Sequence, residues 1–182
     1  QGRAHAVRLA SEGADIIAFD VPESRPWTTY VLGSEADLAE TARLVEQQGR
    51  RIVTGRADVR DWAAVKNVVD HGVAELGPVN IVVANAGMGS KGGPFWKIPD
   101  EQWTDLVDVN LSGVWRTVKA AMPSMLEAGR GGSIILIASA AAVASSSIEA
   151  LAISIAVSSH TMVWKLTSAS RRPCEISAWY GV

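Results

Sequence analysis

Four short apolar runs in this sequence each end on a small polar or acidic side chain. Every run is rich in β-branched or small apolar residues, which predicts a strand that is covered on both faces. Ligands of open α/β sheets bind beyond the carboxyl ends of the parallel strands, so these polar groups could contact one bound molecule. They are Asp20, Asp58, Asn85 and Ser139.

Asp20 has the chemistry of a ribose-binding carboxylate. Asp20 follows a predicted helix over residues 3–12, a stop at Gly13 and a predicted strand over residues 15–19. This order is typical of half a dinucleotide-binding βαβ unit. An acid at this place accepts hydrogen bonds from adenosine ribose hydroxyls and repels the extra phosphate of NADP, which favours NAD. The alternative is a solvated acid at a strand end.

The run over residues 79–84 is followed by Asn85, Ala86 and Gly87. Their small side chains leave the backbone accessible at the edge where a ligand is expected. The same three residues could also form an ordinary turn. The pattern therefore indicates a binding edge only in combination with the other strand ends.

Strands, helices and glycine stops alternate along the chain, and this alternation predicts an α/β fold with a doubly wound parallel sheet. Ser34 and Asp61 are candidate N-caps of helices that end near Gly49 and Gly77. A long helical region should begin at Pro99 and break near Asn110 or Gly113. The predicted strands cover residues 15–19, 51–57, 79–84 and 133–137, and the helices residues 3–12, 34–49, 61–76 and 99–129.

Composition is ordinary for one globular domain: 182 residues, 48% hydrophobic and 20% charged. The net charge of −2 gives no indication of nucleic-acid binding. One cysteine, Cys174, and three histidines indicate a reducing, cytoplasmic setting without a disulfide or a metal site. The weakly polar run 133–157 contains six serines and Glu149, so we expect no membrane span there, and nothing in the sequence resembles a signal peptide.

Over about residues 2–139 the chain resembles the short-chain dehydrogenase/reductase family. The resemblance depends on Asn85-Ala86-Gly87 after a buried strand, on the stretch Val109-Asn110-Leu111-Ser112-Gly113, and on the strand that ends at Ser139. Finer features resemble the mycofactocin-coupled, carveol dehydrogenase-like branch of this family. They are the stretches over residues 14–20, 57–61 and 105–110 and the long insert after Asp20.

The resemblance implies a Rossmann-like fold, an NAD cofactor and a role for each matching residue. Gly2 resembles the last glycine of the phosphate-binding turn, and Asp20 the ribose acid. Asp58 and Val59 resemble the pair beside adenine. Asn110 resembles the catalytic asparagine that bends the helix and holds a water, and Ser139 the catalytic serine. Asn85, Ala86 and Gly87 resemble the turn that follows the cofactor.

At its start the chain departs from the family pattern. The family's first strand and first two turn glycines would precede Gln1, and that strand is the central one in the order 3-2-1-4-5-6. Its absence would leave two strand edges unpaired, at about 1–3 kcal/mol for each buried orphan group. We therefore expect an incomplete fold, a chain that is a fragment of a longer protein, and low stability.

The second departure follows Ser139. The family places Tyr-x-x-x-Lys about thirteen residues later, where this chain has Ala152 and Ala156, and neither Tyr30 nor Tyr180 has a lysine four residues on. Such a tyrosine is the acid/base group of hydride transfer. Residues 140–174 resemble nothing in the family, so residues 1–139 are family-like and 140–182 divergent. A reading frame lost near residue 140 and regained near 174 is the simplest hypothesis.

The resemblance implies an NAD-dependent oxidoreductase of an alcohol or ketone, impaired here because the tyrosine and lysine are absent. The alternatives are a non-catalytic NAD-binding relative and a truncated pseudogene product. The family usually pairs through the helix around residues 110–125, which implies a homo-oligomer. The sequence does not specify the substrate.

Overall fold

The computed structural model describes residues 1–23, 25–28, 30–89, 94–138 and 162–166, with backbone only for Phe95 and residues 162–166. Helices and strands alternate along the chain. In order, the elements are α1 (Gly2–Ser11), β1 (Ile16–Asp20), α2 (Glu35–Glu46), β2 (Ile52–Arg56), α3 (Trp62–Leu76), β3 (Ile81–Ala84), the 3₁₀ turn η1 (Phe95–Lys97), α4 (Asp100–Val107), the π-helical turn η2 (Asp108–Ser112), α5 (Gly113–Ala128), β4 (Gly132–Leu136) and β5 (Met162–Leu166).

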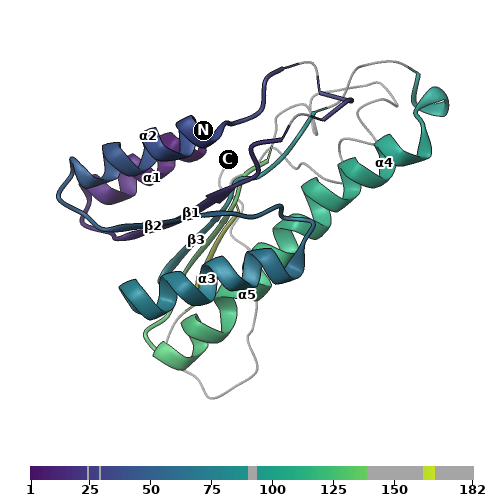
Figure 1. Ribbon diagram of the computed structural model, residues 1–182. Helices are drawn as coiled ribbons and strands as arrows, with labels where there is room; N and C mark the ends of the chain where they lie inside the picture. The colour runs from purple at the N-terminus through teal and green to yellow at the C-terminus, as the bar shows by residue number, and fades with distance from the viewer. Residues whose placement is uncertain (24, 29, 90–93, 139–161, 167–182) are drawn as a thin grey trace.

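The first two strands form a parallel pair with helices on both faces. Ile16 lies opposite Ile52, and Asp20 opposite Arg56, so the carboxyl ends of β1 and β2 coincide. Figure 1 shows α1 beside α2 on one face of this pair, while α3 lies on the opposite face and packs against α5. This arrangement confirms the predicted doubly wound α/β fold.

The remaining strands form a second sheet of mixed direction. β3 pairs in parallel with β4, with Ile81 opposite Ser133, as predicted. β5 runs antiparallel to β4, with Gly132 opposite Leu166. No strand was predicted at residues 162–166, so β5 adds an antiparallel strand to the predicted parallel ones. Sheets that are otherwise parallel often carry such an antiparallel strand at one edge.

The two sheets do not join through a shared strand in the part of the chain that the structure describes. There, β1 pairs only with β2, and β3 pairs only with β4. Among the described residues, one backbone edge of β1 and one of β3 therefore have no strand partner. This agrees with the incomplete sheet expected from the sequence.

Local sequence signals explain where the helices begin and end. The Ser34 hydroxyl accepts a hydrogen bond from the Asp37 N–H while the Asp37 carboxylate accepts one from the Ser34 N–H, a capping box at the start of α2. Asp61 caps α3 by accepting from the N–H groups of Ala63 and Ala64. Gly77 and Gly129 end α3 and α5 at φ values of 95° and 63°, which favour glycine.

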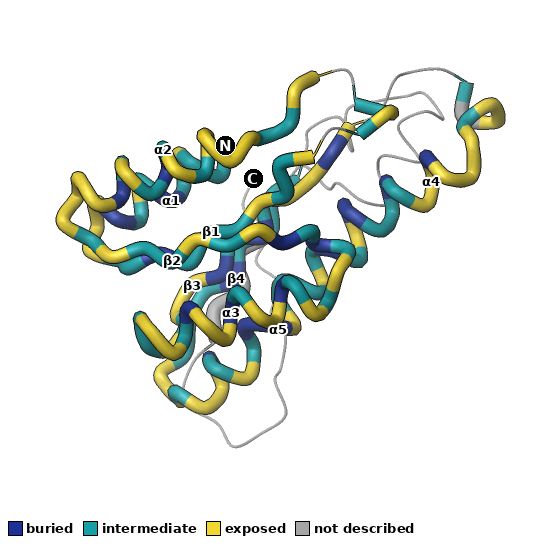
Figure 2. Tube along the Cα trace, viewed as in Figure 1, coloured by how far each residue is buried: buried dark blue, intermediate teal, exposed yellow. Residues whose placement is uncertain are grey.

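The core lies between the strands and the inward faces of the helices (Figure 2). Val45 of α2 and Val65 of α3 are fully buried on the two faces of the β1–β2 pair, and Met125 of α5 is buried under the second sheet. Exposed positions recur along each helix between the buried ones, as amphipathic helices require. Among the residues described, no helix is long and apolar enough to cross a membrane.

Asp37 gives α1 and α2 a pH-dependent contact. Arg3 of α1 donates hydrogen bonds to Asp37 Oδ1 at 2.7 Å and to Thr41 Oγ1 at 3.1 Å. Hydrogen bonds from the Ser34 side chain, then from Arg3, lower the pKa of Asp37 to about 2. A lowered carboxylate pKa stabilises the fold above the unfolded value of 3.8, and the benefit is lost as the pH falls toward 2.

We therefore expect the urea midpoint of the chain to fall between about pH 4 and about pH 2, and to fall less in Asp37→Asn. Urea titrations at several pH values, followed by far-UV circular dichroism, measure both slopes. Asp70→Asn, an exposed residue on α3 that pairs with Lys66, is the control and should keep the wild-type slope. Equal slopes in Asp37→Asn and the wild type would contradict this account.

Candidate functional site

Asp20 lies at the carboxyl end of β1, and one of its carboxylate oxygens has no hydrogen-bond partner among the described residues. Its Oδ1 accepts a hydrogen bond from the Val21 N–H at 2.7 Å, and its backbone carbonyl accepts from the Ala57 N–H at 3.0 Å. A Cβ at position 33 would lie 2.9 Å from Oδ2, so only glycine allows this approach without a shift. The exposed carboxylate is therefore held in one orientation at the strand end.

Asp58 lies beyond the end of β2 and is bound by two arginines. Its carboxylate accepts hydrogen bonds from the Arg60 N–H at 2.9 Å and from Arg60 Nη2 at 2.8 Å, and it forms an ion pair with Arg25. Burial favours the neutral acid, but the hydrogen bonds from Arg60 and the charges of both arginines outweigh it and lower the pKa of Asp58. Asp58 is thus a partly buried anion whose oxygens already have donors.

Val59 places its side chain in a small apolar cluster at the same edge. It is 5% exposed and packs with Met88, Leu106 and Val109. A Cβ at position 113 would lie 2.6 Å from Val59 Cγ2, so the start of α5 approaches Val59 closely. This cluster joins the end of β2 to the loop after β3 and to the helices that follow.

Asn85 lies beyond the carboxyl end of β3, next to the start of α1. A Cβ at position 2 would lie 3.1 Å from Asn85 Nδ2, so Gly2 leaves the helix N-terminus close to this amide. The Oδ1 atom of Asn85 is buried and has no hydrogen-bond partner in the described structure. Ala86 and Gly87 are exposed at the same edge.

Asn110 is buried, and both the oxygen and the nitrogen of its side-chain amide form hydrogen bonds with the Met88 backbone. Its Oδ1 accepts from the Met88 N–H at 2.8 Å, and its Nδ2 donates to the Met88 carbonyl at 2.9 Å. Asn110 lies in the π-helical turn η2, which forms the helix break that the sequence predicts near Asn110 or Gly113. A Cβ at position 87 would lie 3.4 Å from Asn110 Oδ1, so the turn at Gly87 lies directly beside this amide.

The structure thus brings most of the predicted site residues to one edge, with contacts that connect them. Asp20 and Asp58 share the end of the β1–β2 pair, Gly2 meets Asn85, and Asn110 holds Met88 beside Val59. Ser139 lies outside the described residues. The contact partners that sequence reasoning missed are Arg25, Trp27, Tyr30, Gly33 and Met88, which belong to irregular segments without periodicity.

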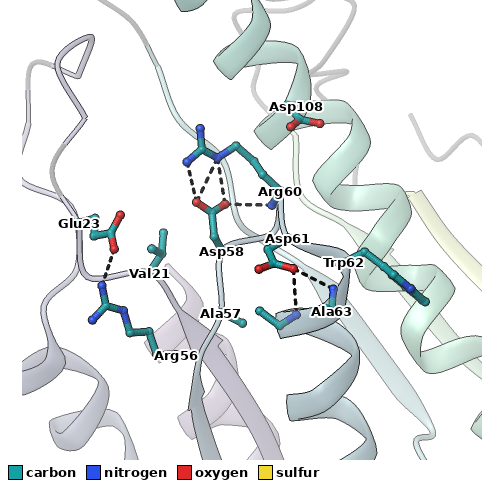
Figure 3. A pocket seen from close by; sticks show the side chains of 11 residues that line it. Val21, Glu23, Arg56, Ala57, Asp58, Arg60, Asp61, Trp62, Ala63 and Asp108 are labelled. Atoms are coloured by element: carbon teal, nitrogen blue, oxygen red, sulfur yellow. Dashed lines mark hydrogen bonds and ion pairs between the residues drawn. The ribbon is translucent and has the colours of Figure 1, made fainter.

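A separate pocket of about 810 Å³ lies beside this edge (Figure 3). Figure 3 shows three of its acidic groups with partners: Asp58 with Arg60, Glu23 with Arg56, and Asp61 with N–H groups of the first turn of α3. The fourth, Asp108, pairs with Arg116. Its lining includes Asp58 but not Asp20, Asn85 or Asn110. The pocket thus shares Asp58 with the edge that carries the predicted site residues but does not contain the other three. Within the described ranges, no three His, Cys, Asp or Glu side chains are grouped to hold a metal ion.

Comparison with known proteins identifies the family of the chain. A family model described as short chain dehydrogenase matches residues 2–151, which extends past the boundary at residue 139 that the sequence motifs suggested. The chain belongs to the short-chain dehydrogenase family.

Several relatives are closely similar. The chain is 48% identical over 143 residues to a (-)-trans-carveol dehydrogenase of Rhodococcus erythropolis, covering 78% of this chain and 51% of that protein. It is equally identical, over the same shares, to an uncharacterised NAD-dependent oxidoreductase of Mycobacterium tuberculosis. The chain therefore spans about half the length of the curated relatives it matches.

Two solved structures show the same fold. A carveol dehydrogenase of Mycobacterium avium in complex with NAD aligns with a TM-score of 0.80 and 50% identity, covering 84% of this chain and 55% of that one. A short chain dehydrogenase of Mycobacterium paratuberculosis bound to NAD aligns with a TM-score of 0.79 and 46% identity, covering 85% and 58%. They confirm the Rossmann-like fold class and the carveol dehydrogenase-like resemblance.

Removal of the Asn110 amide should destabilise the chain. Asn110→Ala leaves the buried N–H and C=O of Met88 unpaired, which costs about 2–4 kcal/mol in free energy of unfolding. Urea denaturation measures the loss. Asn67→Ala, an exposed position on α3, is the matched control and should change stability by less than about 0.5 kcal/mol. A similar small change in both variants would show that the Met88 hydrogen bonds contribute little.

Proposed function

We propose that this chain binds NAD at the edge formed by the ends of β1, β2 and β3. The observation that carries the proposal is the buried, unpartnered Oδ1 of Asn85 beside Gly2. A buried acceptor without a partner is costly, and a ligand or backbone donor at this place would satisfy it. The NAD-bound structures of similar sequence support the choice of ligand.

Each predicted residue has a role in this proposal. The free oxygen of Asp20 would accept hydrogen bonds from the adenosine ribose, and its charge would disfavour NADP. Gly2, at the start of α1, would allow the pyrophosphate to approach the helix N-terminus. Asp58 and Val59 would form the adenine side. Asn85, Ala86 and Gly87 would follow the cofactor.

The proposed reaction is hydride transfer between NAD and an alcohol or ketone, in the cytoplasm. The bound nicotinamide would supply or accept the hydride. Asn110 would position the Met88 backbone and the kinked helix at the reacting end, and Ser139 would hydrogen-bond the reacting oxygen. The names of similar proteins make carveol, a secondary alcohol, a reasonable probe. The mycofactocin link stays a prediction.

Turnover by this chain should be low, because Ala152 and Ala156 stand where the family has its tyrosine and lysine. Loss of a positioned proton donor typically lowers the rate by about 10²–10⁴-fold. A non-catalytic NAD-binding protein is therefore the second candidate. The third is a product that does not fold stably, since β1 and β3 each have an edge without a strand partner in the described structure.

Two measurements on the 182-residue chain separate these candidates. The first is titration with NADH, followed by quenching of tryptophan fluorescence. The second is absorbance of NADH formed from NAD and carveol. Binding with turnover supports the oxidoreductase, and binding without turnover supports the non-catalytic protein. Absence of binding by a folded chain would refute the proposal.

Asp20 should determine the preference of the chain for NADH over NADPH. In Asp20→Ala the affinity for NADH should fall about tenfold, because a charge-assisted hydrogen bond is lost, and the preference over NADPH should shrink. Fluorescence titrations with both dinucleotides measure the ratio of dissociation constants. Asp70→Ala is the control and should keep the wild-type ratio. An unchanged ratio in Asp20→Ala would remove Asp20 from the proposed site.

We also propose that two copies of the chain pair through α4 and α5. Trp103 of α4, Leu111 of the connecting turn η2 and Trp115 of α5 are 40%, 46% and 58% exposed and follow one another at eight- and four-residue spacing. Four-residue spacing brings Leu111 and Trp115 to neighbouring positions on the helix surface. The Lys119 ammonium lies 4.3 Å from the Trp62 ring centroid and 4.4 Å from that of Trp115.

If this face is an interface, Trp115→Glu should convert a dimer to a monomer, because a charge replaces apolar contact area. Size-exclusion chromatography with light scattering measures the mass. Val31→Glu, which places the same charge at an exposed position outside these helices, is the control and should keep the wild-type mass. A monomeric wild type would contradict the proposed pairing.

A further inference from the structure

The irregular segment between β1 and α2 leaves Asp20 and returns to it. It begins at Val21, directly after the carboxylate, and ends at Gly33, where a Cβ would lie 2.9 Å from Asp20 Oδ2. A turn at Arg25, whose carbonyl accepts from the Thr28 N–H and hydroxyl, reverses its direction. The segment 21–33, which we call the adenosine loop, therefore has adjacent ends, as in an Ω-loop.

Three side chains of the adenosine loop reach three different elements of the candidate site. Arg25 forms an ion pair with Asp58, beyond the end of β2. Trp27 Nε1 donates to Asp105 Oδ2 of α4 at 3.0 Å. The hydroxyl oxygen of Tyr30 accepts from the Gly89 N–H, after β3, at 2.8 Å. One loop thus connects all the strand ends to which a nucleotide role was assigned.

The first two anchors are shielded from solvent and linked to each other. The side chains of Arg25 and Asp58 are 14% and 18% exposed, so this ion pair is screened less than a surface pair. Arg60 pairs with both Asp58 and Asp105 and so joins the two acceptors. The Trp27 ring packs against the apolar cluster of Val59, Met88, Leu106 and Val109.

We propose that Arg25 and Trp27 are positioning residues that fix the adenosine loop as a wall of the adenosine half of the NAD site. Asp58 already accepts hydrogen bonds from Arg25 and Arg60, so its contribution is to hold the loop rather than to offer a free oxygen. Anchoring the loop before the ligand arrives removes the cost of ordering it on binding. This inference rests on the proposed NAD function.

The test compares ligands that contain or lack adenosine. Arg25→Met removes the ion pair, Arg25→Lys keeps the charge, and Trp27→Phe keeps a ring without the N–H donor. Each variant is titrated with NADH, with ADP-ribose and with reduced nicotinamide mononucleotide. In Arg25→Met the affinities for NADH and ADP-ribose should fall by about tenfold, while that for the mononucleotide should change by less than about twofold.

The conservative variants give the graded result that a positioning role requires. Arg25→Lys should recover part of the loss, because it retains the charge but not the planar donor geometry, and Trp27→Phe should lose about threefold for NADH and ADP-ribose. Arg43→Met removes an exposed ion pair to Glu40 on α2 and is the matched control, with wild-type affinities for all three ligands.

Specific outcomes overturn the inference. If Arg25→Met binds NADH as tightly as the wild type, the loop anchors do not position adenosine, although NAD binding itself stands. If all three ligands weaken equally, the effect is a general loss of structure and not the proposed one. If the folded wild type binds no NADH, the proposed function fails and the inference fails with it.

Discussion

The candidate site depends on the pair of hydrogen bonds between the Asn110 amide and the Met88 backbone. These bonds attach the loop after β3 to the π-helical turn between α4 and α5, at 2.8 and 2.9 Å. They also fix the position of Met88 in the apolar cluster with Val59 and Val109. An amide that satisfies one buried N–H and one buried C=O lets an irregular loop lie inside the fold without orphan polar groups.

The sequence predicts the regular elements well because their signals are local. The Ser34 and Asp61 caps, the stops at Gly77 and Gly129, and the break at Asn110 all follow from short-range backbone requirements. The adenosine loop could not be predicted in this way. Its anchors join residues far apart in sequence, such as Trp27 and Asp105, and an irregular segment has no period that would reveal them.

The antiparallel β5 was also missed, for a different physical reason. The five residues Met162–Leu166 are apolar except for Lys165 and show no distinctive alternation, so pairing to β4 decides their state. The same tertiary information is needed for Asn85. Its identity suggested a turn or a binding edge, but only the packing beside Gly2 shows that its Oδ1 is buried without a partner.

The adenosine loop, whose ends meet at Asp20 and Gly33, can change length during evolution at little cost to folding. Closing a loop twice as long costs only about 0.6 kcal/mol more in chain entropy, and insertions between adjacent ends leave the sheet register unaltered. Relatives could therefore lengthen or shorten this segment between its anchoring residues Arg25, Trp27 and Tyr30 at little cost to folding. Natural variation can accumulate here while the strands beneath it remain the same.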